Sequence, residues 1–535
     1  MKQKSEAWLA PLFSILIFGL AGLALIPYPG LQNDEVFFAG PLYLKGAAFY
    51  QIEAGALKIP LMVMSYTGAL KTWIYAGLFQ IFGPSEWSVR VPALIAGMGT
   101  IWLTWLWTRR VAGDRAAAIA ALLLSTDAVF LMTNTFDWGP VALQHLLLMA
   151  GLVALQSNRT GTAFFLWGLG LWDKALLVWP LIGLGAAAAI AYPGESMRRL
   201  KSRQALIATL ALALGASPLI WFNIARRGQT ATDNARFAST GSVAQKVSAL
   251  RETANGRALF SYMVYPDDTA FRGQAEDAIG RVAARLKALP GDHTRNWMIP
   301  AYALAFVLYL ALWRSPRRRV MTFLLIAGAV IWLQMALNRG TGEASHHVIL
   351  IWPLPAIFVG IAFSEAASLI PRRQAWVAVA VTAVFVAGNL LNLNEYIAEF
   401  ATNGARGGWT DAIYPLAEGT IRTDKTQWYG LVDWGCLNTL AVLHEGDLPM
   451  FVADVPAPGA PPTEANRKEI LREIGSEDRV FIEHTDDKQM FPGVNGRLKQ
   501  AAEDLGYVEQ PEKTVRDSNG RPVFQLFRFR KMAPQ

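Results

Sequence analysis

The chain has 535 residues and a net charge of +8, from 49 Lys and Arg against 41 Asp and Glu. Hydrophobic residues make up 53% of the sequence and charged residues only 17%, whereas a soluble globular chain carries about a quarter. This composition excludes an ordinary soluble domain, and the scatter of basic residues over short loops argues against nucleic acid as a partner. Because Cys436 is the only cysteine, no intrachain disulfide can form.

Apolar blocks of about twenty residues, the length that crosses a bilayer, recur along residues 1–394. We interpret the first block as a span because it is too long for a signal-peptide core and no small-residue cleavage site follows it. The pattern therefore predicts a mainly α fold, a polytopic membrane helical bundle of about eleven transmembrane helices. The predicted spans are centred on residues 8–28, 90–108, 116–135, 138–156, 162–173, 175–192, 204–225, 297–313, 320–338, 346–367 and 375–394.

Charge in the connections indicates an orientation. If the N-terminus is cytoplasmic, every inner connection carries Arg or Lys, as the positive-inside rule requires. An odd number of spans then places the C-terminal tail outside, which in a bacterium means the periplasm or the cell exterior, with the bundle in the inner (cell) membrane. The inner basic residues are Arg109, Arg110, Arg159, Arg198, Arg199, Lys201, Arg203, Arg314, Arg317, Arg318, Arg319, Arg372 and Arg373.

Two outer loops are expected to matter for function. Residues 29–89 form the first outer loop, which holds most of the candidate chemistry. Residues 227–296 form a second, lid-like loop that includes an amphipathic stretch, because Ile279, Val282 and Leu286 recur at helical spacing with basic residues opposite. That stretch, residues 278–289, predicts a helix lying in the membrane interface.

Residues 395–535 differ in character, since Pro, Gly and charge all rise. Short apolar runs alternate there with polar helical stretches, which predicts a small α/β domain outside the membrane. Pro462–Ile474 is expected to be a helix, capped by Thr463. The expected strands lie at Tyr429–Val432, Met450–Ala453, Val480–Ile482 and Val523–Phe527.

Asp34 and Glu35 are the candidate catalytic pair. They follow the first span directly, and a free carboxylate is ionised at neutral pH. Such a group can accept the proton of a hydroxyl as its oxygen attacks a sugar carbon. The alternative is a solvated loop start, where polar residues are common.

Lys58, Lys71 and Arg90 are the candidate cations of the same segment. A phosphate leaving group departs as a stable anion, so it needs positive charge rather than a general acid. Anchoring at the membrane interface is the alternative for the two lysines and the commoner role for an arginine at the mouth of a span.

Two further aspartates stand out. Asp137 lies in the tight turn between the third and fourth spans, where it can orient an acceptor or a metal, or serve the turn alone. Asp127 lies within a predicted span, where a charge costs about 2.5–3.5 kcal/mol. It is expected to face the bundle interior, with Ser125 and Thr126 as its partners.

Lys174, at the outer end of the fifth span, is a further candidate for phosphate binding, although a local pair with Asp173 is the alternative. His346 and His347 open the tenth span and are candidate substrate contacts. Adjacent histidines point about 100° apart on a helix and make poor joint metal ligands. No cofactor is certain, and a divalent metal stays an open possibility.

Together these motifs resemble the C-type (GT-C) glycosyltransferases that use polyprenyl-phosphate sugars. Protein O-mannosyltransferases and the lipid A aminoarabinose transferase, of glycosyltransferase family 39, are the nearest in pattern. The resemblance rests on Asp34-Glu35, on Asp137, on Gly168-Leu169-Gly170-Leu171-Trp172-Asp173-Lys174, and above all on Phe82-Gly83-Pro84-Ser85-Glu86-Trp87-Ser88-Val89-Arg90-Val91-Pro92.

The resemblance implies that Asp34 is the catalytic base, that Asp137 positions substrate and that Lys174 contacts the lipid phosphate, with inversion at the anomeric carbon. The sequence departs from the family pattern upstream of Phe82-Gly83, where the expected lysine position falls near Thr67. Lys71, one helical turn later, is the favoured substitute, and Lys58-Ile59-Pro60 is the other.

The sequence therefore predicts a membrane glycosyltransferase that moves a sugar from a polyprenyl-phosphate donor to a lipid, glycan or protein acceptor on the outer face. Membrane lipids are its other expected partners. Two other classes stay open. A transporter or flippase of lipid-linked sugars predicts paired repeats and interrupted helices, and a non-catalytic scaffold gives no reason for acids and lysines to gather at the outer ends of the spans.

Overall fold

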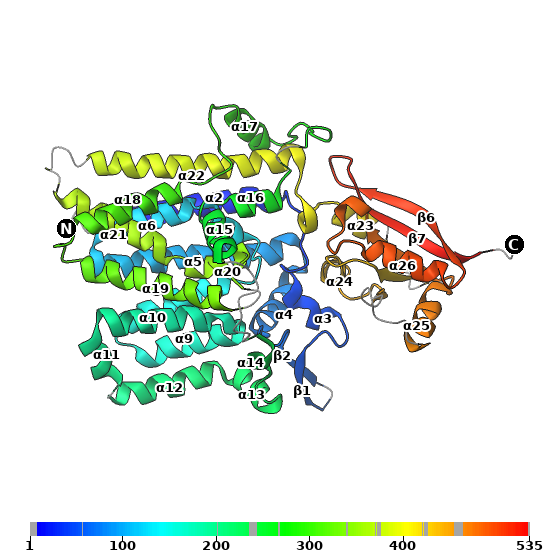
Figure 1. Cartoon of the computed structure of the whole chain (residues 1–535), viewed down its shortest axis with the longest axis horizontal. Coiled ribbons are helices and arrows are strands. Elements are labelled where there is room, and N and C mark those ends of the chain that lie inside the picture. The colour runs from blue at the N-terminus through cyan, green and yellow to red at the C-terminus, as the bar shows by residue number, and fades with distance from the viewer. Residues whose placement is uncertain are drawn as a thin grey trace.

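The computed structural model describes residues 8–55, 57–200, 202–234, 243–265, 268–338, 341–369, 371, 376–419, 421, 426–453 and 464–532. Figure 1 shows two parts along the long axis of the molecule, a bundle of helices and a smaller part built on a sheet, which leads to the C-terminus. The predicted fold class, a mainly α bundle with a small C-terminal α/β part, is confirmed.

The helical bundle takes up most of the chain before residue 404. Within it, α5 packs against α2, α6 and α8, while α10 packs on α19 and α12 on α9. The helices of the bundle are α2 (Leu9–Leu25), α5 (Glu86–Ala112), α6 (Asp114–Thr126), α7 (Ala128–Thr135), α8 (Ala142–Gln156), α9 (Thr160–Asp173), η2 (Ala175–Leu177), α10 (Val178–Ala191), α11 (Pro193–Leu200), α12 (Arg203–Gly215), α13 (Ser217–Ala225), α18 (Met298–Ala311), α19 (Arg318–Leu337), α20 (Ser345–Val348), η3 (Ile349–Ile351), α21 (Leu354–Leu369) and α22 (Trp376–Asn403).

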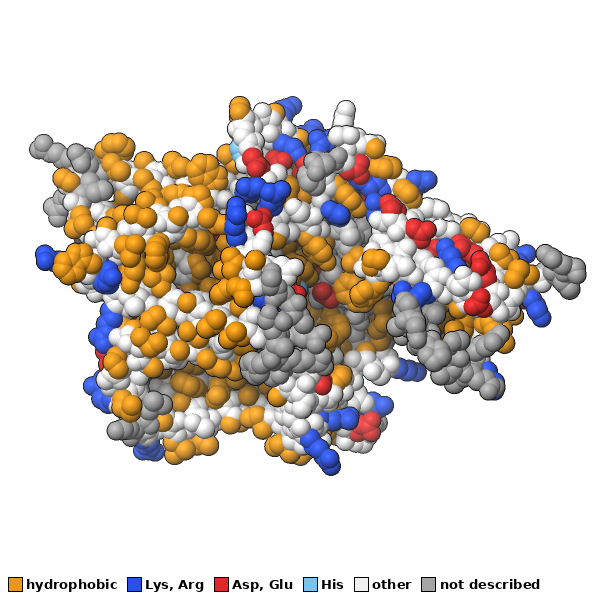
Figure 2. Space-filling model, in the orientation of Figure 1, with side chains coloured by type: hydrophobic (Ala, Val, Ile, Leu, Met, Phe, Trp, Pro, Cys, Tyr) orange, Lys and Arg blue, Asp and Glu red, His pale blue; other side chains and the backbone are white. Residues whose placement is uncertain are grey.

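Membrane-spanning length is found in three helices of the described chain, namely α5, α19 and α22, and in up to six if three bent pairs each count as one span. The helices α2, α8, α18 and η2–α10 are apolar but shorter. The predicted number of eleven spans stays a prediction. Hydrophobic side chains cover much of the visible bundle face, whereas charged ones gather over the C-terminal part and near α17 (Figure 2).

Three of the predicted spans are broken, and one of them, residues 346–367, bends by 44° between η3 and α21, where Trp352 and Pro353 lie. Residues 116–135 bend by 64° at Asp127, and residues 204–225 bend by 70° where Pro218 opens α13. Asp127 faces the interior as expected, but Ser125 and Thr126 donate their hydroxyls to the carbonyl of Leu122 instead.

Asp127 is satisfied from elsewhere because it caps α7 rather than lying inside a helix. Its carboxylate accepts hydrogen bonds from Trp352 Nε1 at 2.7 Å, from Asn296 Nδ2 at 3.1 Å and from the Val129 amide at 3.0 Å. The break between α6 and α7 thus places this carboxylate against distant elements, which local spacing does not reveal.

The outer segments contain more regular structure than the sequence indicates. Residues 29–89, expected to be a loop, hold a hairpin and a thirteen-residue helix. In the second segment the predicted interface helix is present as α17, and Ile279, Val282 and Leu286 are exposed on it. The elements are η1 (Phe37–Ala39), α3 (Gly40–Tyr43), β1 (Tyr50–Ala54), β2 (Leu57–Met62), α4 (Leu70–Phe82), α14 (Gln229–Asn234), α15 (Val243–Ala254), α16 (Arg257–Met263) and α17 (Ala278–Lys287).

The C-terminal part is a five-stranded mixed sheet in the order β4-β3-β5-β7-β6, with β3, β4 and β5 parallel and β7 antiparallel to β5 and β6. All four predicted strands are present. Its elements are η5 (Gly407–Trp409), α23 (Ile413–Gly419), β3 (Trp428–Leu431), α24 (Leu437–Leu443), β4 (Met450–Val452), α25 (Glu464–Ile474), β5 (Arg479–His484), η6 (Asp486–Lys488), α26 (Val494–Glu503), β6 (Tyr507–Arg516) and β7 (Pro522–Lys531).

Sequence reasoning missed the edge strand β6 because it is polar and largely exposed, with Pro511 and several charges along it. The helix α25 agrees with the predicted one, whereas Pro462 and its expected cap Thr463 lie outside the described residues. Helix α22 continues past residue 394, so the domain boundary proposed there falls within a helix.

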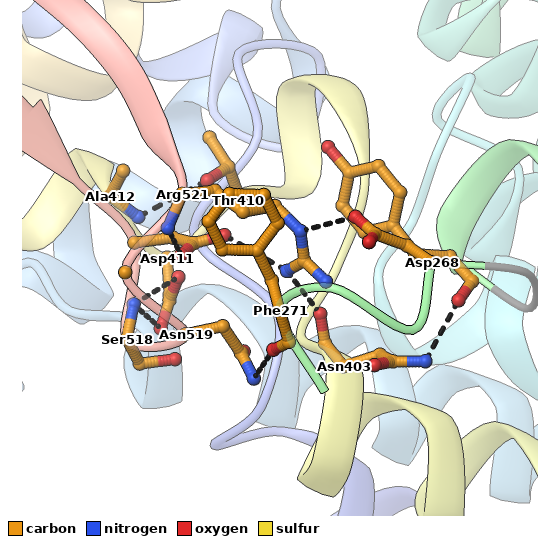
Figure 3. A network of polar contacts seen from close by, with 12 residues as sticks. Asp268, Phe271, Asn403, Thr410, Asp411, Ala412, Ser518, Asn519 and Arg521 are labelled. Carbon is orange, nitrogen blue, oxygen red and sulfur yellow. Dashed lines mark hydrogen bonds and ion pairs between the residues drawn. The ribbon is translucent and has the colours of Figure 1, made fainter. Parts of the chain in front are cut away.

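Arg521 joins the C-terminal part to the bundle (Figure 3). Its Nε donates to Asp268 Oδ2 at 2.8 Å and its Nη1 to the carbonyl of Asn403 at 2.5 Å. In the same turn, Asn519 Nδ2 donates to the carbonyl of Phe271 at 3.0 Å. The β6–β7 turn is thereby tied both to the end of α22 and to the segment after α16.

Candidate active site

A cavity of about 620 Å³ lies between the bundle and the C-terminal part. Both parts supply polar side chains to its wall, so the site depends on how the two are docked. The bundle side and the first outer segment contribute Asn33, Asp34, Tyr66, Thr67, Lys174 and His346, and the C-terminal part contributes Asp433, Trp434, Asn438 and Arg497.

Arg90 fixes the loop that carries Asp34. Its guanidinium forms a bidentate pair with Glu35, at 2.7 Å and 2.8 Å, and also donates to three carbonyls of the loop, those of Ile26, Pro29 and Gly30. Glu35 and Arg90 are fully buried and do not line the cavity. Such a fork holds a loop in one conformation, because each N–H has a fixed direction.

The C-terminal part holds the same loop from the other side. The Gly30 amide donates to the carbonyl of Trp409 at 2.7 Å, and Asn33 Oδ1 accepts from the amide of Asn438 at 3.1 Å. A side chain at Gly30 would place its Cβ 1.9 Å from the carbonyl oxygen of Thr410, so only glycine fits there. Residues 26–35 are thus clamped between the two parts.

Asp34 projects into the cavity while its neighbour Glu35 points away from it. Burial raises the pKa of the Asp34 carboxyl, and the nearby positive charge of Lys174 opposes that rise. A carboxylate in this setting is a stronger base than one in water.

Lys174 follows the end of α9 with an extended backbone that pairs with Thr67. Burial lowers the pKa of its ammonium group to about 8, against the opposing carboxylates Asp173, Asp137 and Asp34. Its Nζ donates to the carbonyl of Gly139. The lysine therefore presents a partly desolvated positive charge to the cavity.

Asp137 and Lys71 form a second buried ion pair, and neither lines the cavity. Asp137 has a left-handed backbone, with φ of 47°, and its Oδ1 accepts the amides of Val141 and Ala142 at 2.9 Å each, at the start of α8. Lys71 also lies 4.3 Å from the centre of the Phe38 ring. Both side chains are already engaged and brace the cavity from behind.

His346 lines the cavity beside Gly139, whose φ is 76° and whose added Cβ would lie 2.5 Å from that of His346. The ring of His346 packs edge-on against Trp138 at 4.7 Å and lies 4.2 Å from that of His347. Among the described residues, no group of three or more His, Cys, Asp or Glu side chains is arranged to hold a metal ion.

Lys58 lies apart from the other candidates. It is on strand β2, its side chain is 65% exposed, and its nearest partner is Glu53 on the paired strand at 3.7 Å. The structure thus brings Asp34, Lys174 and His346 to one cavity, puts Glu35, Arg90, Asp137 and Lys71 into buried pairs, leaves His347 next to His346, and separates Lys58.

The C-terminal residues of the cavity were not found by sequence reasoning. Asp433 comes two residues after β3, at the edge where the parallel strands end, which is a common position for binding residues in α/β sheets. That position was the available signal. Arg497 offered none, because a soluble helix normally carries several charged residues.

The structure is similar to ArnT from Cupriavidus metallidurans bound to undecaprenyl phosphate, with a TM-score of 0.58 and 15% identity over 98% of both chains. This likeness shows that the chain has the fold of the C-type glycosyltransferases, as the sequence predicts. Residues 68–221 match the model of the family described as dolichyl-phosphate-mannose-protein mannosyltransferase, a range that holds Asp137 and Lys174.

Two other solved structures share less with the chain. Arabinofuranosyltransferase AftD from Mycobacteria matches with a TM-score of 0.48 and 15% identity, over 99% of this chain and 40% of AftD. The oligosaccharyltransferase of Archaeoglobus fulgidus in the apo form gives a TM-score of 0.46 and 14% identity, over 94% and 69%. No curated protein matches the sequence significantly.

Proposed function

We propose that the protein is a membrane glycosyltransferase that moves a sugar from a polyprenyl-phosphate donor to a lipid, glycan or protein acceptor. The observation that carries this proposal is the placement of Asp34 and Lys174 on the wall of one cavity. The reaction requires two charges, a negative one to accept the proton of the acceptor hydroxyl and a positive one to stabilise the departing phosphate. The likeness to a protein bound to undecaprenyl phosphate supports a lipid-phosphate donor.

In the proposed reaction, Asp34 accepts the proton of the acceptor hydroxyl as the acceptor oxygen forms a bond to the anomeric carbon. The bond between that carbon and the phosphate oxygen breaks, and the lipid phosphate leaves with the electron pair. Direct displacement from the opposite face inverts the anomeric centre. Lys174 stabilises the negative charge that develops on the departing phosphate.

The two buried ion pairs act as positioning groups in this proposal. Arg90 and Glu35 hold the loop of Asp34, and Lys71 and Asp137 hold the turn before α8 whose Gly139 carbonyl accepts from Lys174. His346 lies on the same wall and is a candidate contact for the sugar. In this arrangement only groups on the cavity wall touch substrate.

The proposed setting is the inner membrane of a bacterium, with the cavity and the C-terminal part on the outer side and the N-terminus in the cytoplasm. The predicted inner basic residues support this orientation through the positive-inside rule. The donor lipid would then reach the cavity from the outer leaflet, and segment 227–296 would cover it as a lid.

The test is transfer from a panel of radiolabelled polyprenyl-phosphate sugars in membranes that contain the intact protein. We expect Asp34→Asn to lower the rate by about 10²–10⁴-fold, since loss of a general base typically costs that much. Asp114→Asn is the matched control, because that exposed carboxylate pairs with Arg109 away from the cavity. Full activity of Asp34→Asn would remove the base assignment.

The same experiment separates the rival classes. If donor crosses the bilayer without losing its sugar, the transporter interpretation holds. If the intact protein neither transfers nor translocates any donor, the scaffold interpretation gains instead.

A further inference from the structure

The C-terminal wall of the cavity carries a cation that the proposed reaction does not use. This is Arg497 of α26, which lines the cavity together with Phe491 and Val494. Its Nε is buried and has no hydrogen-bond partner, and no described residue forms an ion pair with it. A buried guanidinium N–H without an acceptor is costly, so an anionic ligand in the cavity would stabilise this partly exposed side chain by supplying an acceptor.

A set of hydrogen bonds fixes the segment that precedes Arg497. Asp433 Oδ2 accepts from His484 Nδ1 at 2.9 Å and from the amide of Met490 at 2.6 Å, and its Oδ1 accepts from the amide of Phe491 at 3.2 Å. These bonds pin the segment that leads into α26. The backbone of Arg497, one turn into that helix, is therefore held at a defined place on the wall.

Asp433 is the acidic residue of the C-terminal part that lines the same cavity as Arg497, and it is already engaged. Although burial would raise it, the hydrogen bonds from His484 and the backbone amides hold the pKa of the Asp433 carboxyl below its usual value. The carboxylate is thus charged and satisfied within its own domain. Arg497 keeps its positive charge free for a ligand in the cavity.

The two cations of the cavity come from opposite walls. Lys174 shares its wall with Asp34, whose negative charge it offsets, whereas Arg497 faces the cavity from the C-terminal part with no such partner in the described chain. The guanidinium fork matches the geometry of a phosphate or a carboxylate. The first turn of α26 begins at Gly493, which has no side chain to cap it, and this end also favours an anion.

We propose that Arg497 recognises an anionic group, a phosphate or a carboxylate, on the acceptor molecule. The proposal rests on the proposed glycosyltransferase function and adds the substrate class on the acceptor side. The donor phosphate is held by Lys174 on the bundle wall, and the acceptor reaches Asp34 from the C-terminal wall, where its anionic group meets Arg497.

The first experiment separates acceptor recognition from chemistry. Intact protein, Arg497→Gln, Arg497→Lys and the control Arg516→Gln are supplied with radiolabelled donor and with membrane extracts divided by anion exchange into neutral and anionic pools. We expect label in the anionic pool. Arg497→Gln should lower the rate at limiting acceptor roughly tenfold or more, because one charge-assisted contact is lost, with Arg497→Lys intermediate.

The donor KM and the rate of donor hydrolysis test whether Arg497 contacts only the acceptor. The donor KM and the slow release of sugar to water should change less than about twofold in Arg497→Gln, if the arginine meets only the acceptor. Arg516 is exposed on β6 and does not line the cavity, so Arg516→Gln should match the wild type. Label in the neutral pool, or a raised donor KM with unchanged acceptor dependence, would overturn the proposal.

A second measurement does not depend on turnover. Inorganic phosphate, at matched ionic strength against chloride, should raise the unfolding temperature of the intact protein, and Arg497→Gln should lose most of that rise. If no donor supports transfer but this phosphate effect is present, the proposed function fails while the anion site stands. If transfer occurs and neither phosphate nor the arginine matters, the anion site fails alone.

Discussion

The two walls of the cavity are held rigid by different kinds of interaction. On the bundle wall, charges sit in pairs behind the surface, so that Arg90–Glu35 and Lys71–Asp137 brace the groups that face the cavity. On the C-terminal wall, one carboxylate, Asp433, ties a segment of the sheet domain by accepting backbone amides. The first wall is held by ion pairs that join a helix to a loop or turn, and the second by hydrogen bonds within the sheet domain.

Residues of the bundle wall could be predicted from sequence, whereas those of the C-terminal wall could not. Asp34, Asp137 and Lys174 could be predicted from sequence because they lie at the outer ends of predicted spans, in motifs that resemble those of a known family. In a soluble sheet domain charges are ordinary. Asp433 and Arg497 therefore stand among many similar residues, and only the fold shows that they share a cavity.

The largest effect is expected from breaking the brace of the bundle wall. Arg90→Gln leaves Glu35 buried without its partner, which typically costs about 3–5 kcal/mol. We expect a lower unfolding temperature and loss of transfer, since the loop of Asp34 loses its anchor. Denaturant or thermal unfolding of the purified protein measures the loss of stability. Wild-type stability would show that the loop is held by the C-terminal part alone.

Undocking the C-terminal wall should come next. Arg521→Gln removes the ion pairs to Asp268 and Asp517, the latter buried, and the bond to the carbonyl of Asn403. We expect about 2–4 kcal/mol lower stability and faster proteolysis between the two parts. Unchanged proteolysis would mean that the remaining contacts suffice to hold the docked state.

The pH dependence tests the cavity face of the bundle wall. Asp34 must be deprotonated to act as a base, so activity should rise with pH through its raised pKa. In the proposed reaction Lys174 must be protonated to hold phosphate, so activity should fall above about pH 8.

Lys174→Arg sharpens this assignment, because an arginine stays charged throughout. Its alkaline limb should move upward while the acidic limb stays in place, which pH profiles of kcat/KM would record. An unmoved alkaline limb would assign that ionisation to another group.

The smallest effect is expected at Lys58. This lysine is exposed on the hairpin and pairs with the equally exposed Glu53, so Lys58→Gln should alter transfer by less than about twofold. The rate of transfer at limiting donor measures it. A larger loss would indicate that the hairpin closes over the donor during the reaction.

Much of the fold could be predicted because apolar runs of bilayer length, apolar residues at helical spacing and short apolar runs between polar stretches are strong signals. The bundle, the α17 helix and the four apolar strands follow from them. What could not be predicted depends on contacts far apart in sequence. The partners of Asp127 come from residues 296 and 352, and the polar edge strand β6 pairs with β7 through its backbone rather than through an apolar pattern.

Within the site, the sequence indicated candidate residues but not which of them line the cavity. Asp34 and Glu35 are adjacent and chemically alike, yet one faces the cavity and the other is enclosed by Arg90. Only the path of the loop decides between them. Lys58 and Lys71 are likewise similar in sequence terms. Lys58 lies exposed on the hairpin, away from the cavity, whereas Lys71 is buried on α4.

The loop at Gly30 has a consequence for engineering. Its amide bonds to the carbonyl of Trp409, and its Cα packs so closely on Thr410 that the two backbones fit as a single joint. The C-terminal part therefore cannot be exchanged on its own between related proteins. A chimaera that swaps it between relatives would have to carry residues 26–35 along, or Asp34, the proposed base, would be displaced even though every cavity residue remained in the chain.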